Sequence, residues 1–111
     1  MMLDQYGGCS GIRDAGLLES ALARPQQLHH YGKPTMPEMA AAYTAGIVKN
    51  HPFLDGNKRT GFMMGAGFLE RNGYEFLASE TEVVIRTLAL AAGEMTEAAY
   101  ADWLKANSKK A

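Results

Sequence analysis

The sequence predicts an all-α protein, a compact bundle of five or six helices around one buried central helix. Every long segment of the 111-residue chain carries helical signals, and no segment alternates apolar and polar residues as an amphipathic strand would. An apolar run over residues 61–69 has apolar side chains all round rather than on one stripe. A helix of this kind is enclosed by others, so we expect it at the centre of the bundle.

Length and composition are those of one soluble globular domain, covering residues 1–111. Hydrophobic residues make up 47% of the chain and charged residues 21%, and the net charge is -1. That charge argues against a direct nucleic-acid binder. The apolar run is far shorter than the roughly 20 residues of a membrane-spanning helix. Cys9 is the single cysteine, so no internal disulfide forms and the cytoplasm is the expected compartment.

The N-terminal region predicts one clear helix between two irregular stretches. Residues 3–6 form only the stub of a helix. Asp14 is the expected N-cap of a helix that runs through Ala23, and Pro25 is expected to end it. From residue 24 to residue 37, three prolines and a glycine predict a loop.

Two helices with a polar loop between them follow. The first covers residues 38–50 and should stop there, because Pro52 pushes the preceding residue out of the α region. Its expected inward face consists of Met39, Ala42, Tyr43, Gly46 and Ile47. The second covers residues 57–71 and ends at an Asn-Gly pair that can cap it. Its three glycines lower helix propensity, so close helix packing is expected at Gly61, Gly65 and Gly67.

The C-terminal region predicts two further helices. Residues 74–77 are a short extended link. Residues 79–82, Ser-Glu-Thr-Glu, form a capping box that starts a helix running to Ala92. Thr96 is the expected N-cap of the last helix, and residues 109–111 are expected to be a frayed tail.

The loop over residues 51–60, His-Pro-Phe-Leu-Asp-Gly-Asn-Lys-Arg-Thr, is the most informative stretch for function. Free N–H groups and the dipole make a helix N-terminus an anion site. Gly56 lets the backbone approach a phosphate closely, and Asn57 tolerates a left-handed turn, so the pair can form a nest of N–H donors. Lys58 and Arg59 add a point charge and a forked donor for phosphate oxygens.

Two residues upstream of this turn can supply the rest of a phosphate-transfer site. Asp55 can hold Mg²⁺, which takes one or two carboxylates together with substrate phosphates. His51 can act as a general base, because an imidazole titrates near neutral pH. Phe53, between them, is expected to point into the core and anchor the loop.

Each of these residues also has a purely structural interpretation. A histidine beside a proline is more often structural, an Asp-Gly-Asn sequence is often only a turn, and Lys58 and Arg59 could simply be solvated. Cations in the first turn of a helix oppose its dipole, however, and a bound anion would compensate for that. Their combination on one loop therefore favours a phosphate-handling site.

The same loop resembles the signature of the Fic/Doc (Fido) family, His-Pro-Phe-x-Asp/Glu-Gly-Asn-Gly/Lys-Arg. The resemblance extends to Tyr6-Gly7-Gly8 and to residues 11–18, 72–74 and 91–94, and it favours the Doc (death-on-curing) toxin branch. It implies a single Fic/Doc-like helical domain. Most of the first helix that usually precedes the Tyr-Gly-Gly sequence is missing here.

The differences from the family pattern indicate which reaction to expect. Members that transfer AMP usually carry glycine at the position of Lys58 and a second arginine at the position of Phe62. Doc-like toxins carry the lysine and lack that arginine, as this chain does. The resemblance therefore implies a protein kinase that binds ATP in the reverse sense and transfers its γ-phosphate to elongation factor Tu. An AMP transferase is the alternative.

The resemblance also implies a role for each residue. His51 is the catalytic base and Asp55 the Mg²⁺ ligand. The phosphate-binding residues are Gly56, Asn57, Lys58 and Arg59. Lys49 falls where Doc carries a basic residue, although it could equally be a helix-end lysine that matches the dipole.

Regulation is expected to come from a partner protein. Some family members carry an inhibitory helix with a Ser/Thr-x-x-x-Glu-Gly/Asn pattern, and no serine or threonine of this chain fits it. A Phd-like antitoxin whose disordered tail folds in a groove is therefore expected. The missing first helix would uncover Leu17, Leu18 and Leu22, which predicts a homodimer or an antitoxin complex. A catalytically silent antitoxin-binding module remains a further alternative.

Overall fold

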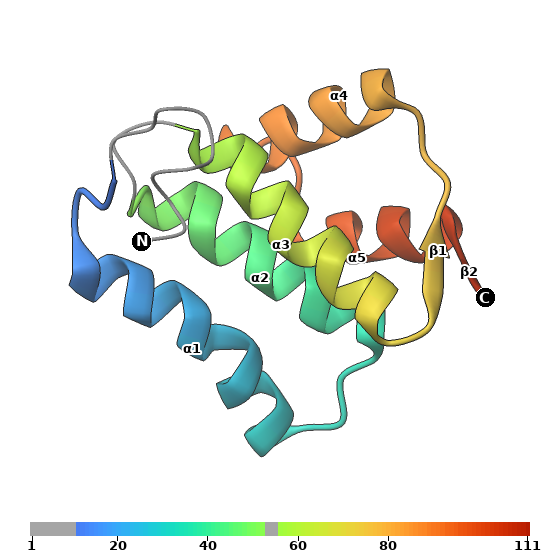
Figure 1. Cartoon of the computed structure of the whole chain (residues 1–111), viewed down its shortest axis with the longest axis horizontal. Helices are drawn as coiled ribbons and strands as arrows, with labels where there is room; N and C mark the ends of the chain where they lie inside the picture. Colours follow the sequence, from blue (N-terminus) through green and yellow to red (C-terminus); the bar gives the residue numbers. More distant parts are fainter. Residues whose placement is uncertain (1–10, 53–55) are drawn as a thin grey trace.

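The computed structural model describes residues 11–52 and 56–111, which form five α-helices and a two-stranded sheet (Figure 1). The helices are α1 (Ala15–Tyr31), α2 (Met36–Asn50), α3 (Asn57–Arg71), α4 (Glu80–Ala91) and α5 (Glu97–Ala106). The strands are β1 (Tyr74–Phe76) and β2 (Ser108–Lys110). This architecture confirms the predicted all-α class. No helix in the described part of the chain is long and apolar enough to cross a membrane.

Helix α1 is longer than the sequence predicts. Asp14 is its N-cap, as expected, and its Oδ1 accepts the Leu17 N–H at 3.0 Å. Pro25 does not end the helix, which continues to Tyr31, so the predicted loop of residues 24–37 is reduced to residues 32–35. Pro25 lacks the N–H that would bond the Ala21 carbonyl. It is fully buried, and the Ala21 backbone packs directly on Gly46 of α2. Tertiary packing thus keeps the helix continuous across the missing hydrogen bond.

Helix α2 begins two residues earlier than predicted and ends where predicted. Thr35 caps it, because its Oγ1 accepts the Glu38 N–H at 3.2 Å while Glu38 Oε1 accepts the Thr35 N–H at 2.7 Å. Within the predicted inward face, Ala42, Gly46 and Ile47 are buried, whereas Met39 and Tyr43 are half-buried.

The central helix of the bundle is α2, not α3 as predicted from the apolar run. Helix α2 is buried on every side, and its buried residues are Pro37, Ala40, Ala41, Ala42, Thr44, Ala45, Gly46, Ile47 and Val48. Helix α3 buries only Asn57, Gly61, Gly65 and Leu69. Its Met63 and Met64 are exposed. Alanines let neighbouring helices approach α2 from all directions, which explains why it takes the centre (Figure 1).

Two of the three glycines in α3 allow close contact with α2. A Cβ at Gly61 would lie 2.9 Å from Val48 Cγ1, and one at Gly65 would lie 2.8 Å from the Ala40 carbonyl oxygen. Thr44 strengthens this contact by donating its hydroxyl to the Gly61 carbonyl at 2.8 Å. Gly67 has no atom within 4 Å of the same position, so its predicted packing role is wrong.

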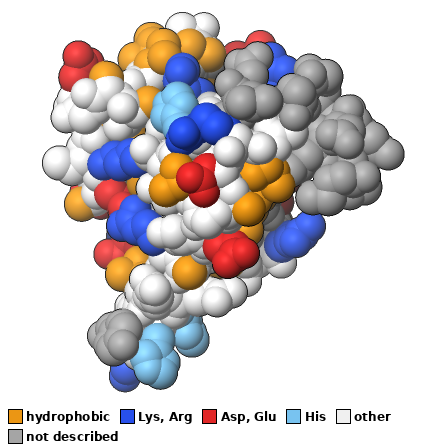
Figure 2. All heavy atoms as spheres, turned by 90° about the vertical axis from the view of Figure 1, so that its left-hand side faces the viewer, with side chains coloured by type: hydrophobic (Ala, Val, Ile, Leu, Met, Phe, Trp, Pro, Cys, Tyr) orange, Lys and Arg blue, Asp and Glu red, His pale blue; other side chains and the backbone are white. Residues whose placement is uncertain are grey.

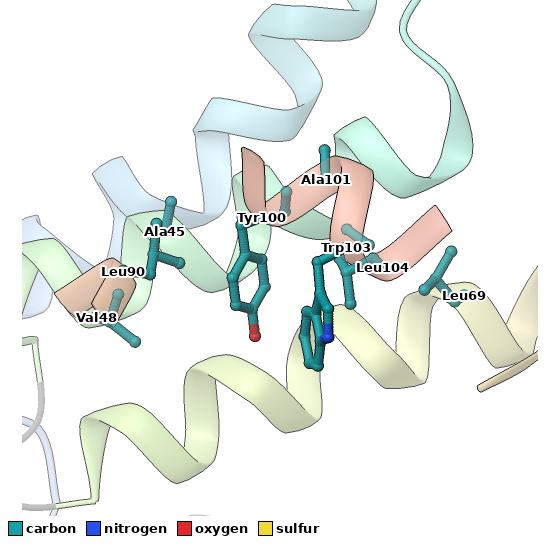
Figure 3. Packing of buried hydrophobic residues seen from close by; sticks show 10 residues of the cluster. Ala45, Val48, Leu69, Leu90, Tyr100, Ala101, Trp103 and Leu104 are labelled. Carbon is teal, nitrogen blue, oxygen red and sulfur yellow. The ribbon is translucent and has the colours of Figure 1, made fainter. Parts of the chain in front are cut away.

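Aromatic side chains of α5 complete the core. The rings of Tyr100 and Trp103 are 5.1 Å apart and lie between α5 and α3 in Figure 3. The Tyr100 hydroxyl bonds Thr87 Oγ1 of α4 at 2.9 Å. Burial raises the pKa of Tyr100 above its ordinary value of 10.0, against the opposing effect of hydrogen bonds with Thr87 and Thr44.

The C-terminal residues form a strand rather than the predicted frayed tail. Strand β2 pairs antiparallel with β1, with Tyr74 opposite Lys110 and Phe76 opposite Ser108. The extended link at 74–76 offers backbone N–H and C=O groups that pair with those of a second extended segment. The predicted caps Ser79 and Thr96 are confirmed, since each accepts a backbone N–H three residues ahead.

Candidate functional site

The end of α2 and the start of α3 meet at one corner of the molecule, and the candidate site lies there (Figure 1). His51 is the C-cap of α2, and its N–H donates to the Ile47 carbonyl at 3.1 Å. Its backbone is left-handed, with φ 51° and ψ 52°. Among the described residues it is the non-glycine residue with positive φ. This conformation costs a β-carbon-bearing residue about 1 kcal/mol, and here the imidazole is exposed.

Asn57, the first residue of α3, holds the ring of His51. Asn57 Nδ2 lies 3.1 Å from His51 Nδ1, and Asn57 itself is only 5% exposed. An amide N–H that donates to Nδ1 leaves the proton of the neutral imidazole on Nε2. With the amide rotated by about 180° its oxygen would accept the Nδ1 proton and free Nε2 as a base. Asn57 therefore selects the tautomer.

In the turn at Gly56 and Asn57, where a nest is predicted, the left-handed residue is Gly56. Gly56 is left-handed, with φ 74°, and it is the N-cap of α3. Asn57, in contrast, is helical and turns its amide toward His51. The second left-handed position is His51 itself. The two left-handed residues thus bracket the loop on either side.

The first turn of α3 carries the predicted cations. Lys58 and Arg59 are both exposed, and among the described residues no acidic side chain lies in this turn and no side chain caps the helix. Lysine and arginine side chains gather beside a histidine on the face shown in Figure 2. A helix N-terminus with adjacent cations is chemically suited to bind a phosphate.

The remaining predicted site residues are placed only in part. Lys49 is exposed in the last turn of α2, two residues before His51. Asp55 and Phe53 lie outside the described residues, and so do the predictions of Mg²⁺ binding and core anchoring that fall on them. Across residues 11–52 and 56–111, no group of three or more His, Cys, Asp or Glu side chains could hold a metal ion.

An apolar groove, which sequence reasoning missed, extends from the two cations between α3, β1 and α4. Its volume is about 550 Å³. It is lined by Lys58, Arg59, Phe62, Phe76, Ala78, Glu80, Val83, Val84, Thr87 and Leu88. Phe62 packs against Phe76 with ring centroids 5.5 Å apart. Most of the lining comes from residues 76–88, far from the loop in sequence, so no local pattern pointed to it.

Arg13 is a second feature that the sequence did not identify as part of the site. Its Nε donates to the His51 carbonyl at 2.8 Å and its Nη2 to the Asn50 carbonyl at 3.2 Å, across 38 and 37 residues of sequence. The backbone N–H groups of Arg13 and Asp14 both donate to the Pro52 carbonyl, at 2.6 and 3.0 Å. The segment before α1 therefore holds the backbone that carries His51.

Comparison with known proteins supports the assignment suggested by the loop. The sequence model of the Fic/DOC family matches residues 1–69. The chain is also similar to a protein named Toxin Doc from Mycolicibacterium smegmatis, with 41% identity over 76 residues. The match covers 66% of this chain and 58% of that relative, so the chain spans less than two thirds of the relative's length.

Proposed function

Because this chain belongs to the Fic/DOC family, we propose that it is the toxin of a toxin–antitoxin system and acts as a protein kinase. It transfers a phosphate from ATP to a hydroxyl of a translation factor such as elongation factor Tu, and so arrests translation in the cytoplasm. The supporting observation is His51, held against Asn57 at the start of a helix whose first turn exposes Lys58 and Arg59. Similarity to a protein named Toxin Doc supports the toxin role.

In the proposed step the Asn57 amide is rotated so that its oxygen accepts the Nδ1 proton of His51, and Nε2 accepts the proton of the target hydroxyl as the hydroxyl oxygen bonds to the γ-phosphorus. The bond from that phosphorus to the β–γ bridging oxygen breaks, and ADP leaves. His51 later releases the proton to solvent. Lys58 and Arg59, with the α3 N-terminus at Gly56 and Asn57, would bind the phosphates, and Lys49 could add a contact. These groups suit a transfer that depends mainly on positioning and charge.

Magnesium is part of this proposal. Exposed cations in the first turn of a helix fit the polyphosphate of ATP. Asp55, just before the glycine of the loop, is the proposed Mg²⁺ ligand. A single carboxylate is compatible with Mg²⁺, which keeps several waters and takes its other ligands from substrate phosphates. Bound Mg²⁺ would neutralise charge that develops on the phosphates.

Two residues favour phosphate transfer over AMP transfer. Family members that transfer AMP usually carry glycine at the position of Lys58 and arginine at that of Phe62. Here the Phe62 ring packs on Phe76 in the apolar groove and offers no cation for a terminal phosphate. AMP transfer is the second candidate, because the same histidine and cations could serve a reaction at the α-phosphate.

Transfer of label from ATP to translation factors separates the two reactions. The protein is incubated with purified translation factors, Mg²⁺ and ATP labelled at either the α- or the γ-phosphate. We expect label on elongation factor Tu from γ-labelled ATP alone. Label that arrives from α-labelled ATP alone would reject the kinase and establish AMP transfer.

A Phd-like antitoxin is the proposed partner. Apolar side chains of α4 beside the groove are about half exposed, namely Val84 at 56%, Ile85 at 53% and Leu88 at 47%. Such a surface suits the apolar face of an incoming helix. A second copy of the chain is the alternative partner. It would cover Leu17, Leu18 and Leu22, which are half-buried in α1. We expect sedimentation to show a dimer or an antitoxin complex, and a stable, well-folded monomer without a partner would contradict this.

A catalytically silent antitoxin-binding module is the competing proposal from a different class of function. It needs the groove but not the imidazole. Growth arrest on induction discriminates the two, because the kinase proposal requires His51. If a His51→Ala variant is as toxic as the parent, catalysis is not the cause of toxicity.

A further inference from the structure

We propose that Arg13 is a positioning residue for His51. This inference rests on the proposed role of His51 as the base, and Arg13 itself contacts no reacting atom in it. Its guanidinium holds the backbone of the residue that would accept the proton. The proposal assigns the segment before α1 to the site, although it lies 38 residues away in sequence.

The geometry shows that this segment determines where the loop leaves α2. The Arg13 side chain donates to two consecutive carbonyls, those of Asn50 and His51. Its own N–H and that of Asp14 converge on the next carbonyl, that of Pro52, whose side chain is buried. Asn50 returns a bond from its Nδ2 to the Leu17 carbonyl at 3.0 Å. Three consecutive carbonyls are thus fixed from one short segment.

The backbone of His51 needs this support. A left-handed C-cap is normally glycine, since a β-carbon there is strained. The last carbonyls of a helix also lack intrahelical partners. The planar guanidinium satisfies two adjacent carbonyls at once, and its charge is favourable at the negative end of the α2 dipole. Arg13 therefore stabilises a conformation that histidine alone would rarely adopt.

The strained conformation has a consequence for the imidazole. Asn57 holds the ring at Nδ1, while Arg13 holds the backbone carbonyl of the same residue. In the observed structure the ring makes this contact from a left-handed backbone, so a change of backbone conformation would move the ring away from Asn57. Strain that persists through surrounding contacts is characteristic of functional sites. Loss of Arg13 should consequently release the ring without changing Lys58 or Arg59, which lie on the other side of the loop.

The test uses substitutions that preserve the backbone bonds of Arg13. Arg13→Met keeps most of the aliphatic stem and removes every side-chain donor. Arg13→Lys restores the charge but cannot bond two carbonyls as a planar fork. Arg24→Met is the matched control, because it removes a partly exposed arginine that pairs with Glu97 at 2.7 Å, on α1 and α5.

Two readouts separate positioning from general stability. In the transfer assay we expect Arg13→Met to lower kcat by about 10- to 100-fold. Its Kd for MgATP should stay within a factor of about two of the parent. Arg13→Lys should recover part of the rate, and Arg24→Met should retain all of it. A parallel loss of kcat and ATP affinity, or a parental rate in Arg13→Met, would overturn the proposal.

Nitrogen NMR of the imidazoles tests the same inference without any activity. In the parent, the two ring nitrogens of His51 should differ strongly in shift, because one tautomer dominates. In Arg13→Met the two shifts should move toward each other, as expected when both tautomers are populated. An unchanged His51 spectrum would refute positioning even if transfer is lost. If the parent transfers no label, the proposed function fails, and this spectrum still decides the role of Arg13.

Discussion

Helices α2 and α3 are adjacent, equally long and rich in small residues, yet they differ in how much of their surface is buried. Each has 15 residues. Helix α2 is buried on all sides and holds the bundle together. Helix α3 buries a single row, residues 57, 61, 65 and 69, which are spaced four apart. The neighbouring row begins with Lys58 and Phe62 and faces the groove. The row of α3 that packs in the core and the row that lines the groove are therefore one residue apart in the helix.

The largest expected effect is on the packing row of α3. Gly65→Ala should destabilise the protein by about 3 kcal/mol, because its Cβ would overlap Thr44 Oγ1 and the Ala40 backbone. Gly67→Ala is the control, since nothing lies within 4 Å of that position. It should stabilise the helix by up to about 1 kcal/mol. Urea unfolding measures the free energy of unfolding of both variants. Equal changes in the two would refute the conclusion that α3 packs through only one row of residues.

Substitution of an exposed cation in the first turn of α3 should change ligand binding rather than stability. Arg59→Ala should weaken MgATP binding by about tenfold, because a charge-assisted phosphate contact is lost. Its unfolding midpoint should remain that of the parent, since Arg59 is exposed. Arg71→Ala, which removes an exposed arginine from the last turn of the same helix, should bind MgATP as the parent does. Calorimetric titration compares them, and equal losses would mean that the anion site is not at the start of α3.

A smaller effect is expected in the buried core, at Tyr100 of α5. The pKa of Tyr100 is raised by burial, so the folded state resists ionisation that the unfolded state undergoes near pH 10. Its contribution to stability is complete below that pH and is lost as the pH rises toward the raised folded pKa. Tyr100→Phe removes the bond to Thr87 and should cost about 1 kcal/mol at neutral pH. Its stability should then fall less steeply in alkali. If the unfolding free energies of parent and variant fall in parallel as the pH rises, Tyr100 does not lie in a core that excludes water.

Local features of the fold were predictable, whereas features that depend on packing were not. The caps Asp14, Ser79 and Thr96 were correct because each acts within three residues of itself. The end of α1 was wrong because contact with α2 outweighs the local effect of Pro25. The wrong prediction that α3, rather than α2, is the central helix has the same origin. Apolar residues all round a helix show that it can be buried, but helix contacts decide which helix takes the centre.

The features of the candidate site likewise separate into local ones, which were predictable, and ones that depend on packing, which were not. Residues 51–59 are contiguous, so their types and order were enough to indicate a phosphate site. Asn57 was assigned to phosphate, and its contact with His51 was missed because it depends on the angle between two helices. Arg13 and the groove were missed because long sequence separations divide them from the loop. Sequence order identified the chemical groups, and tertiary structure determined their orientation.

The central claim is that the corner between α2 and α3 performs chemistry through His51. The most direct test compares the transfer of γ-phosphate label to elongation factor Tu by the parent, His51→Ala and His29→Ala. His29 is an exposed histidine near the C-terminal end of α1 and serves as the matched control. We predict that His51→Ala lowers the rate by at least about 100-fold while His29→Ala retains it. A His51→Ala variant that transfers label as fast as the parent would contradict this account.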